Sequence, residues 1–490
     1  MPYPYDDLRE FIDDLKKENE LIEIDSEVDW DLEIGAITRR LAEKGLGRSV
    51  KQGGLPAVVF NNVKDYPGHR ISCMTHGTGK RLAMMLGHSN PEKADLDELQ
   101  DLILNAIDKP IKPVVVSDEE APCKEIKLFD EDCNLYDFPA PLVHEGDGGR
   151  YLGTFHLVAQ KDPDRDWTNW GMYRAMIHDS RTLTGIMASF QHGPSIYYEK
   201  YVPKNEPMPY AIAIGPDPLS LLFAGTPIPP SISEMDVIGG ARGKPLDVVK
   251  CELSDILVPA CSEIVIEGTI HPEKLASEGP FGEYTGFLSP GSGMRPCYEV
   301  NAITYRNSPI LSMSNMGTPV DDGDMVWATG IAASVKRDLI NDNIPINSVN
   351  MVPEASGNLL AVSVRQTPYP RIAQRIMATV FSNPNSQYVD AYLIVNDDVD
   401  VFNATEVLHA MVSRIDPDKD IHVYHQTGNP VCPYVTIDER VNLTSAQVVY
   451  DGTWPVDWVG RQIPCLSSFK HIYPEDMQKK VLKRWQDYGF

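Results

Sequence analysis

The sequence has few basic residues and no long apolar run. Its 44 lysines and arginines are outnumbered by 70 aspartates and glutamates, which gives a formal charge of −26 at pH 7. Nucleic-acid phosphates and anionic membranes both bind to basic surfaces, so this charge balance predicts neither kind of partner. No apolar stretch approaches the roughly 18 residues of a membrane-spanning helix. A local basic pocket for a small anionic ligand is compatible with this composition.

Disulfide and zinc signatures are also missing. The eight cysteines are scattered along 490 residues and include no Cys-x-x-Cys pair. Such cysteines are typical of reduced thiols in the cytosol, rather than of a disulfide framework or a zinc ribbon. The first residues, MPYPYDDLREF, lack the basic and apolar segments of a secretory signal. The sequence therefore predicts a cytoplasmic protein.

The composition that remains is that of an ordinary globular protein, with 42% apolar and 23% charged residues. Its length and changing texture predict several domains. Residues 1–115 predict an N-terminal α/β domain. In this part a helical period over 8–15, with Asp6 placed to cap it, is followed by strand-like segments at 21–25 and 56–63.

The rest of the chain changes texture twice. Residues 116–320 consist of short β-branched runs separated by glycine, proline and aspartate, which predicts a mostly antiparallel barrel or sandwich. Residues 321–490 alternate helical and strand-like segments, which predicts a second α/β domain. The last predicted helix has Pro474 at its first position. It could pack on its own domain or on a partner, through an apolar stripe of Met477, Val481, Leu482 and Trp485.

Three motifs that suggest ligand sites have simpler explanations. The segment THGTGKR at 75–81 lacks the first glycine and the Ser or Thr of a phosphate-binding loop, so we reject that function. The GDGG turn at 146–149 could let a phosphate approach the backbone, although glycine-rich turns between strands are common. The acidic NDDVD segment at 396–400 lacks calcium-loop spacing, so we expect a solvated strand end.

A stronger chemical signal is spread over three segments. Arg174 lies among apolar and aromatic neighbours in WTNWGMYRAM (167–176), where an arginine usually needs an anionic partner. Gln191 and His192 lie at an expected strand end. A lone histidine there is more often structural than functional, so these two residues alone do not define a site.

The third segment, SEGPFGEYTG at 277–286, carries Glu278 and Glu283. Two glycines and a proline separate them, which excludes a helix and predicts that both carboxylates lie on a loop that can turn them inward. Paired carboxylates beside an arginine can have their pKa values pushed apart, which leaves one of them able to donate a proton. Two glutamates in a loop are by default surface residues. This pattern alone therefore does not decide between a catalytic pair and two solvated side chains.

In this order, the segments resemble the UbiD family of reversible decarboxylases. The sequence is especially similar to the branch that includes ferulic or cinnamic acid decarboxylases and the pyrrole-2- and indole-3-carboxylate enzymes. The resemblance covers nearly the whole chain. It is carried by LEIGAITRRLAE (32–43), LVHEGDGGRY (142–151), WTNW-x-x-x-RAM (167–176), QH (191–192), SEIVIEGTI (262–270), EGPFGEYTG (278–286) and YPEDMQKKVLKRWQDYGF (473–490).

This resemblance implies an α/β fold (α+β in its arrangement) of three domains: an N-terminal α/β domain, a central split β-barrel that binds prenylated FMN, and a C-terminal domain that forms a homodimer or higher oligomer. The last helix is expected to reach the partner. The family's metal ligands fall on Asn169, His192 and Glu234, which would hold manganese or magnesium. A potassium ion is expected near the backbone of residues 223–226, and a flavin prenyltransferase is implied as the cofactor's supplier.

The resemblance also assigns catalytic roles. Arg174 would bind the substrate carboxylate, Glu283 would donate the proton that replaces CO2, and Glu278 would hold both in register. The prenylated flavin would accept the electrons of the departing carboxylate. The cofactor is expected to contact the metal ligands, Arg174, and further residues Trp167, Met172, Tyr173, Gln191 and Pro227.

The pocket departs from the fungal branch at several positions. Tyr284 stands where that branch has methionine, and Asn429 stands where it has an aromatic residue. Ser314 and Asn315 are also expected near the pocket. Because an unpaired buried polar group is costly, these residues predict a hydroxylated or heteroaromatic acid rather than plain cinnamate.

Two other classes of function compete with decarboxylation. The first is a metal-dependent hydrolase or lyase on the same scaffold, which would use Glu234, His192 and Glu283. The second is a non-catalytic relative that binds flavin or scaffolds an assembly. The flavin-facing WTNW segment argues against the first, and the complete set of one arginine and two glutamates argues against the second.

Overall fold

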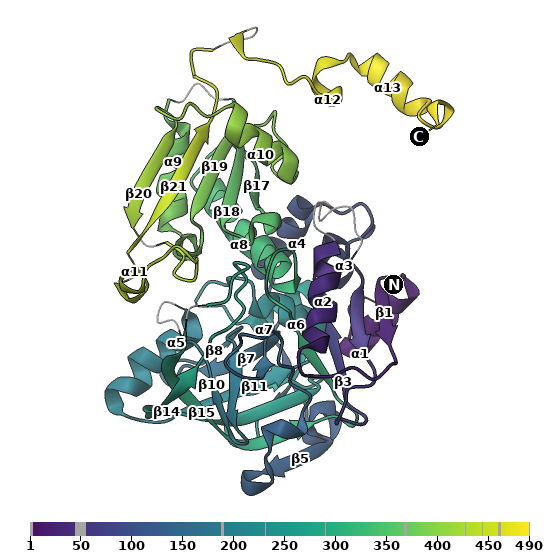
Figure 1. Ribbon diagram of the computed structural model, residues 1–490, viewed down its shortest axis with the longest axis vertical. Helices are drawn as coiled ribbons and strands as arrows, with labels where there is room; N and C mark the ends of the chain where they lie inside the picture. Colours follow the sequence, from purple (N-terminus) through teal and green to yellow (C-terminus); the bar gives the residue numbers. More distant parts are fainter. Residues whose placement is uncertain are drawn as a thin grey trace.

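The computed structural model describes residues 3–44, 55–187, 191–230, 232–289, 291–366, 370–426, 428–442, 444–458 and 462–489. In Figure 1 the N-terminal elements and a large β-sheet form the lower body, and a smaller sheet with its helices lies above them. The helices α12 and α13, at the end of the chain, extend away from both parts.

The N-terminal elements combine helices with a four-stranded sheet in the order β1-β2-β3-β16. Its last strand, β16, pairs in parallel with β3 although more than 200 residues separate them in the sequence. A distant segment therefore completes the N-terminal sheet. The elements are α1 (Leu8–Lys17), β1 (Leu21–Ile24), α2 (Glu33–Lys44), β2 (Ala57–Phe60), β3 (Arg70–Cys73), α3 (Gly79–Met85), α4 (Leu96–Asp108) and β16 (Ile310–Met313).

Asp7, and not Asp6, caps helix α1. The Asp7 carboxylate accepts a hydrogen bond from the backbone amide of Glu10, which lies three residues further along the chain. This is the geometry of an N-cap. The Asp6 carboxylate instead pairs with Arg242 at 2.7 Å. The prediction of Asp6 was therefore wrong by one residue, because the periodicity of a short helix does not define its first turn.

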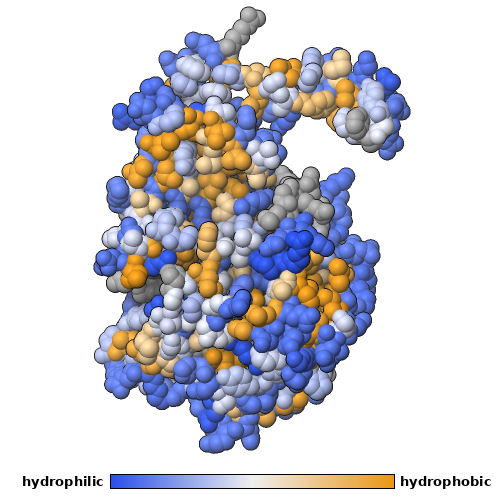
Figure 2. Space-filling view, viewed as in Figure 1, coloured by the Kyte–Doolittle hydropathy of each residue, from blue (hydrophilic) through white to orange (hydrophobic). Residues whose placement is uncertain are grey.

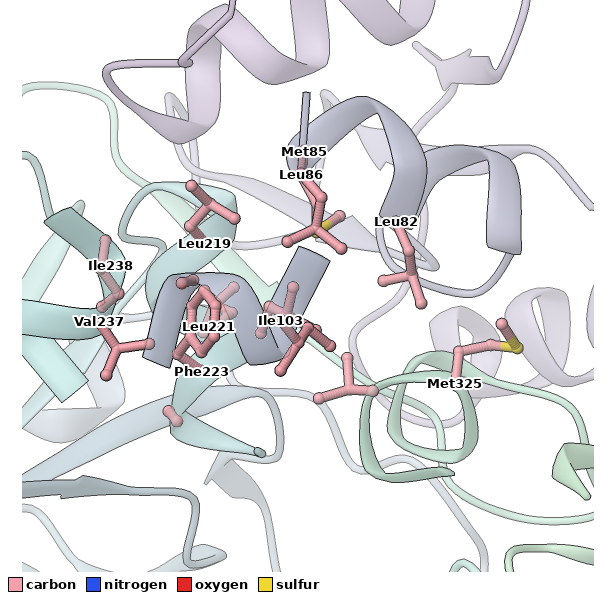
Figure 3. Close-up of a cluster of buried hydrophobic side chains, with 14 of the residues drawn as sticks. Leu82, Met85, Leu86, Ile103, Leu219, Leu221, Phe223, Val237, Ile238 and Met325 are labelled. Atoms are coloured by element: carbon pink, nitrogen blue, oxygen red, sulfur yellow. The ribbon is translucent and has the colours of Figure 1, made fainter. Parts of the chain in front are cut away.

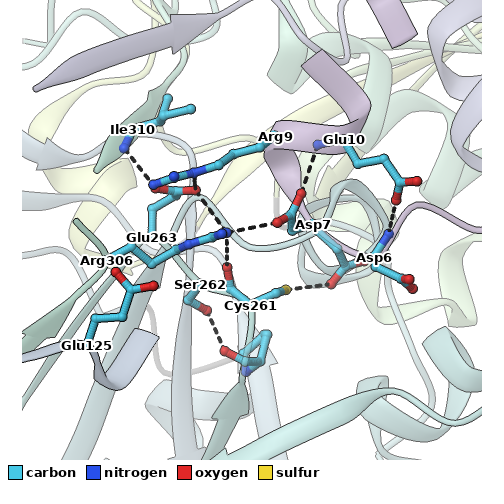
Figure 4. Close-up of polar contacts among 12 residues, drawn as sticks. Asp6, Asp7, Arg9, Glu10, Glu125, Cys261, Ser262, Glu263, Arg306 and Ile310 are labelled. Carbon is cyan, nitrogen blue, oxygen red and sulfur yellow. Dashed lines mark hydrogen bonds and ion pairs between the residues drawn. The ribbon is translucent and has the colours of Figure 1, made fainter. Parts of the chain in front are cut away.

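Ion pairs fasten α1 to the large sheet (Figure 4). The buried carboxylate of Glu263 accepts bonds from Arg9 at 2.7 Å and from the amide of Ile310 at 3.0 Å, and it pairs with Arg306 at 3.3 Å. A buried carboxylate with several donors is stable only while all of them are in place. This cluster therefore fixes the N-terminal helix against strands from the middle of the chain.

Nine of the strands within 116–320 form one antiparallel sheet, in the order β6-β9-β10-β15-β14-β11-β7-β8 with β5 beside β15, whereas β16 joins the N-terminal sheet. This confirms the antiparallel prediction. The sheet is built around its two longest strands, β14 (Ile264–Glu278) and β15 (Gly293–Tyr305). Its other strands are β5 (Ile126–Phe129), β6 (Tyr151–Gly153), β7 (His156–Lys161), β8 (Thr168–Gly171), β9 (Ala175–Asp179), β10 (Thr182–Thr184) and β11 (Met208–Ile214).

Helices and a small sheet cover this body. The described helices here are α5 (His192–Ile196), α6 (Pro218–Ala224) and α7 (Glu234–Arg242), and the small sheet joins β13 (Leu257–Pro259), β12 (Asp247–Lys250) and β4 (Val114–Val115). Figure 3 shows the core that joins the parts of the molecule: Leu82 and Ile103 of the N-terminal helices lie near Leu221 of α6 and Val237 of α7, with Met325 close by. Burial of these side chains holds the parts together.

The C-terminal part has a five-stranded mixed sheet in the order β17-β18-β19-β21-β20, in which β18, β19 and β21 are parallel. The predicted alternation of helices and strands is confirmed. The elements are α8 (Asp322–Asn341), β17 (Ile346–Met351), β18 (Leu359–Val364), α9 (Ile372–Ser382), β19 (Ala391–Asn396), α10 (Ala404–Ser413), β20 (Ile421–Gln426), α11 (Ile437–Asn442) and β21 (Ser445–Gly452).

The chain ends in α12 (Phe469–Ile472) and α13 (Glu475–Lys483), and α13 has no buried residue. Pro474 is the N-cap of α13 rather than its first helical residue. The predicted stripe is largely exposed, with Leu482 at 62% and Trp485 at 47% of their full accessibility. Figure 2 shows apolar surface along this projecting segment. None of the described helices is long and apolar enough to cross a membrane.

Candidate active site

Arg174 lies between strands β8 and β9, and its side chain contacts both predicted glutamates. Its Nε and Nη2 donate to the two carboxylate oxygens of Glu278 at 2.9 and 3.0 Å, and its Nη1 pairs with Glu283. Burial opposes the charged guanidinium, but the two carboxylates outweigh it and raise the pKa of Arg174. The prediction that this arginine needs an anionic partner is confirmed.

The two glutamates sit on different kinds of backbone. Glu278 is the last residue of strand β14, and Glu283 lies in the loop that follows. The prediction that both lie on a loop was therefore wrong for Glu278. Gly279, with φ of +81°, turns the chain directly after the strand, a conformation that favours glycine. This turn lets one rigid and one loop carboxylate face the same guanidinium.

The GDGG turn supports the glutamate loop. The amide of Gly148 donates to the carbonyl of Pro280 at 2.8 Å, and a Cβ on Gly148 would lie 2.1 Å from the carbonyl oxygen of Gly279. The carboxylate of Asp147 accepts a bond from the amide of Gly282 at 2.9 Å. Close packing against the backbone of the glutamate loop therefore explains Gly148, a role that sequence reasoning missed.

Two further side chains hold the cluster. The hydroxyl of Tyr151 donates to Glu278 at 2.8 Å, and the ring of Phe281 lies 4.6 Å from the centre of the Arg174 guanidinium. His156 is fully buried, and its Nε2 is 2.9 Å from the carbonyl oxygen of Tyr173. This nitrogen therefore donates a hydrogen bond to the backbone next to Arg174. No local motif marks Tyr151 or His156, because strand pairing alone brings them here.

Glu283 is buried, and its environment favours the protonated form. Loss of solvent raises the pKa of this carboxyl above its ordinary 4.5, although Arg174 opposes the shift. A carboxyl with a raised pKa can hold a proton for transfer near neutral pH.

We predict a pH dependence from this shift. If protonated Glu283 supplies the proton, kcat/KM falls as the pH rises through its raised pKa, so the alkaline limb lies above 4.5. Initial rates between pH 4 and 10, with enzyme stability checked at each pH, measure this limb. An alkaline limb centred at an ordinary carboxyl value would contradict the assignment.

A cavity of about 440 Å³ lies close by, in the range of small-molecule sites. Its walls come from β8, α5, the segment after α6, the start of α7 and helix α8. All the predicted cofactor contacts except Trp167 and Arg174 line it: Asn169, Met172, Tyr173, Gln191, His192, Pro227 and Glu234. The Trp167 ring packs edge-on against His192 at 5.8 Å.

His192 is the first residue of helix α5, preceded by Gln191 as the N-cap. The predicted strand end was therefore wrong, although both side chains line the cavity. In QHGPS, a glycine and a proline follow His192. Such a short segment does not distinguish the end of a strand from the start of a helix.

The predicted metal ligands fit a divalent cation. Glu234, at the start of α7, is 3% exposed, and burial raises its pKa to about 8. A buried carboxylate is costly unless a cation or donors compensate it, and here the Trp170 amide donates to it at 3.0 Å. With His192 and Asn169 it offers the oxygen and imidazole ligands that manganese or magnesium accept. Among the described residues, no three His, Cys, Asp or Glu side chains gather in a group that could hold a metal, so a site here would need the amide of Asn169 beside His192 and Glu234.

Three of the polar residues predicted to face the substrate bond within the protein, whereas the Ser314 hydroxyl and the side-chain oxygen of Asn315 are buried without a hydrogen-bond partner among the described residues. The Asn429 amide donates to the Tyr284 hydroxyl at 2.7 Å. The Asn315 amide donates to the Gly35 carbonyl at 2.6 Å, beside helix α2. None of these three side chains is among the residues that line the cavity, and neither is Ser314. The preference for a hydroxylated or heteroaromatic acid therefore stays a prediction, and the lining of this cavity includes Met316 and Trp327.

The sequence matches three domains of 3-octaprenyl-4-hydroxybenzoate carboxy-lyases, the UbiD proteins. These are the N-terminal domain over residues 12–103, the Rift-related domain over 114–319 and the C-terminal domain over 324–452. Pyrrole-2-carboxylic acid decarboxylase from Pseudomonas aeruginosa is 33% identical over 99% of this chain and 98% of its own length. Ferulic acid decarboxylase 1 from Saccharomyces cerevisiae is 32% identical over 99% of this chain and 98% of its own length.

Solved structures share the fold. The vanillic acid decarboxylase of Sedimentibacter hydroxybenzoicus in closed form matches with a TM-score of 0.85 at 29% identity, covering 98% of each chain. An evolved dimeric form of the UbiD-class enzyme HmfF from Pelotomaculum thermopropionicum, in complex with prFMN, matches with a TM-score of 0.77 at 24% identity, covering 96% of this chain and all of the other.

Proposed function

Because the chain belongs to the UbiD family of carboxy-lyases, we propose that it is a reversible, non-oxidative decarboxylase that uses prenylated FMN. Its substrate is an aromatic, heteroaromatic or α,β-unsaturated carboxylic acid, as in the relatives named above. The observation that carries the proposal is the buried contact of Arg174 with Glu278 and Glu283, next to a cavity of cofactor size.

In this proposal Arg174 orients the substrate. Its guanidinium is fixed by two bonds to Glu278, so the side chain presents its remaining donors in one place. The substrate carboxylate binds there as an anion and leaves as CO2. Prenylated FMN, when bound, supplies an acceptor for the electron pair released from the carbon–carbon bond.

Glu283 then provides the proton that takes the place of CO2. Its carboxyl is buried and paired with Arg174, and burial raises its pKa. The carboxyl can therefore hold a proton and pass it to the substrate carbon. The product forms when the vacated carbon takes this proton, and Glu283 is reprotonated from solvent. Glu278 keeps its two hydrogen bonds to Arg174 and serves as the positioning carboxylate.

The central sheet is the flavin-binding split barrel in this proposal, and its cavity is the flavin site. Asn169, His192 and Glu234 would hold manganese or magnesium against the cofactor's phosphate, with His192 and Glu234 at the first positions of α5 and α7. Potassium would bind at the backbone of residues 223–226, where helix α6 ends. A flavin prenyltransferase would supply the cofactor.

Metal-dependent hydrolysis is less well supported. Glu234 and His192 line the cavity, but Glu283 does not join them in a group of three that could hold a metal among the described residues. The relatives are named as decarboxylases. A non-catalytic role is also disfavoured, since burying two carboxylates on one arginine serves no purpose in a scaffold.

The test of the function is direct. The protein is co-expressed with a flavin prenyltransferase and purified anaerobically in the dark, and the absorbance and mass of its cofactor are recorded. CO2 release is then followed with cinnamic, hydroxybenzoic, pyrrole, indole and furan carboxylic acids. We expect a prenylated flavin and turnover of one class of acid. Protein that binds no flavin, yet hydrolyses or cleaves a substrate with metal alone, would support the alternative.

Glu234→Gln is expected to lower cofactor retention. The amide keeps the shape of the carboxyl but removes the negative charge that a divalent cation needs, so we expect at least about tenfold less bound metal and flavin after desalting. Metal analysis and flavin absorbance per protein measure this. The matched control is Glu206→Gln on the exposed surface. Equal retention in both variants would contradict the metal assignment.

We also propose a homodimer or higher homo-oligomer in which α13 contacts a partner. Its apolar stripe is exposed in the single chain, and contiguous exposed apolar surface often marks an interface. Leu482→Glu combined with Trp485→Glu is expected to reduce the molar mass measured by light scattering. Lys480→Glu on the same helix serves as the control. An unchanged mass in the double variant would exclude α13 from the interface.

A further inference from the structure

A segment of the C-terminal part touches the loop of the proposed proton donor. Asn429 follows strand β20, and its side-chain amide donates to the hydroxyl of Tyr284 at 2.7 Å. Tyr284 directly follows Glu283. The two bonded residues lie 145 positions apart in the sequence, so only the packing of the C-terminal part on the central sheet brings them together.

Asn429 is held in place by its own domain. Its side-chain nitrogen also lies 2.7 Å from the Asn358 side-chain oxygen, and its backbone amide donates to Asp390 at 2.8 Å. Asn358 and Asp390 immediately precede strands β18 and β19. Asn429 is fully buried, so this amide is a rigid extension of the C-terminal sheet rather than a mobile side chain.

Tyr284 is fixed from two further sides. Its ring packs edge-on against Trp327 of helix α8, with ring centroids 4.8 Å apart, and Trp327 lines the cavity. Its backbone belongs to a tight turn in which the Glu283 amide donates to the Phe287 carbonyl at 2.9 Å and the Gly286 amide donates to the Glu283 carbonyl at 3.0 Å. A shift of Tyr284 therefore moves Glu283 as well.

Arg440 provides an independent indication that the same segment lies over the donor loop. This arginine is in helix α11, and its charge acts on Glu283, where it lowers the pKa of the carboxyl against the larger effect of burial. The Arg440 guanidinium donates to the carbonyls of Val435 and Cys432 at 3.1 and 3.0 Å. The segment from Asn429 to Arg440 is thus one folded unit beside the loop.

We propose that Tyr284 and Asn429 form a positioning pair, through which the C-terminal part sets the place of Glu283 for proton transfer. The proposal rests on the function proposed above. It differs from the sequence prediction, which assigned both residues to substrate recognition. The pair bonds within the protein, and Tyr284 directly follows Glu283, so the role proposed here is to locate the donor.

The test compares Tyr284→Phe, Asn429→Ala and the double variant with the wild type. Each single change removes the bond, and a net hydrogen bond corresponds to roughly a 2- to 12-fold effect. We expect kcat to fall about 3- to 10-fold while KM stays within about twofold. Because both changes break the same contact, the kcat of the double variant should equal that of the less active single variant. It should not fall by the product of the two single losses. Tyr305→Phe, on β15 and remote from the pair, is the control.

A second readout separates positioning from a general loss of packing. Slower protonation makes proton transfer a larger part of the rate, so the solvent deuterium isotope effect on kcat should increase in Tyr284→Phe and stay unchanged in Tyr305→Phe. Wild-type kcat and isotope effect in Tyr284→Phe, or multiplicative losses in the double variant, would overturn the pairing. If Asn429→Ala does not fold, Tyr284→Phe decides by itself. A wild-type protein with no flavin or no CO2 release would instead refute the proposed function.

Discussion

Glu283→Gln is expected to keep the fold and the flavin but to lose decarboxylation by a factor of about 10²–10⁴, the usual contribution of a positioned general acid. Glutamine has nearly the same shape as glutamate, and its carbonyl oxygen can still accept the bond from the Arg174 Nη1. The amide, however, has no proton to give at neutral pH. Substrate binding should therefore change little, and the loss should fall on kcat.

The measurement is CO2 release under saturating substrate, together with flavin absorbance and a melting curve. Glu278→Gln is a useful comparison, because Glu278 holds two bonds of the arginine and would lose binding as well as turnover. A Glu283→Gln protein that forms CO2 and protonated product at the wild-type rate would remove Glu283 as the donor.

Arg174→Lys is expected to lower kcat/KM at least about 100-fold, although the positive charge is retained. The arginine makes a two-point contact with Glu278 and a further one with Glu283, which a single ammonium group cannot reproduce. Hydrogen bonds to charged groups are worth about 1.5–3 kcal/mol each, so losing one or two of them in a buried site accounts for this factor.

Most of the loss should appear in KM if Arg174 binds the carboxylate, and the raised pKa of Glu283 should rise further because its nearest cation is displaced. Steady-state kinetics across a series of substrate concentrations separates the two parameters. The control is Arg181→Lys, on the same sheet and paired only loosely with Glu131 at 3.9 Å. Wild-type kinetics in Arg174→Lys would show that a simple point charge suffices, against the proposed fork geometry.

Several features of the site followed from local chemistry in the sequence. An arginine among aromatic residues implied a buried anion, and Arg174 indeed pairs with two carboxylates. The glycines and proline between Glu278 and Glu283 implied a sharp turn, which Gly279 makes directly after β14. Residue type and spacing carry such information because burial of charge and backbone freedom act over a few residues.

Other features depended on contacts between distant parts of the chain. The partner of Tyr284 is 145 residues away, so the sequence indicates only that this side chain is polar and not that it bonds to Asn429. In the same way, Gly148 packs against the carbonyl of Gly279, and β16 completes a sheet that begins at residue 21. No local pattern encodes the pairing of one segment with another.

The sequence by itself indicated the family and the reaction class through the resemblance of its motifs to the UbiD family. It also determined the residue types that the chemistry needs, since periodicity, turn residues and charged side chains in apolar segments are local properties. Only the tertiary structure decided where those residues lie: Glu278 at a strand end, His192 at a helix start and Asn429 in contact with Tyr284 of the donor loop. The physical reason is that a polar side chain reports its need for a partner, but packing and strand pairing choose which partner it receives.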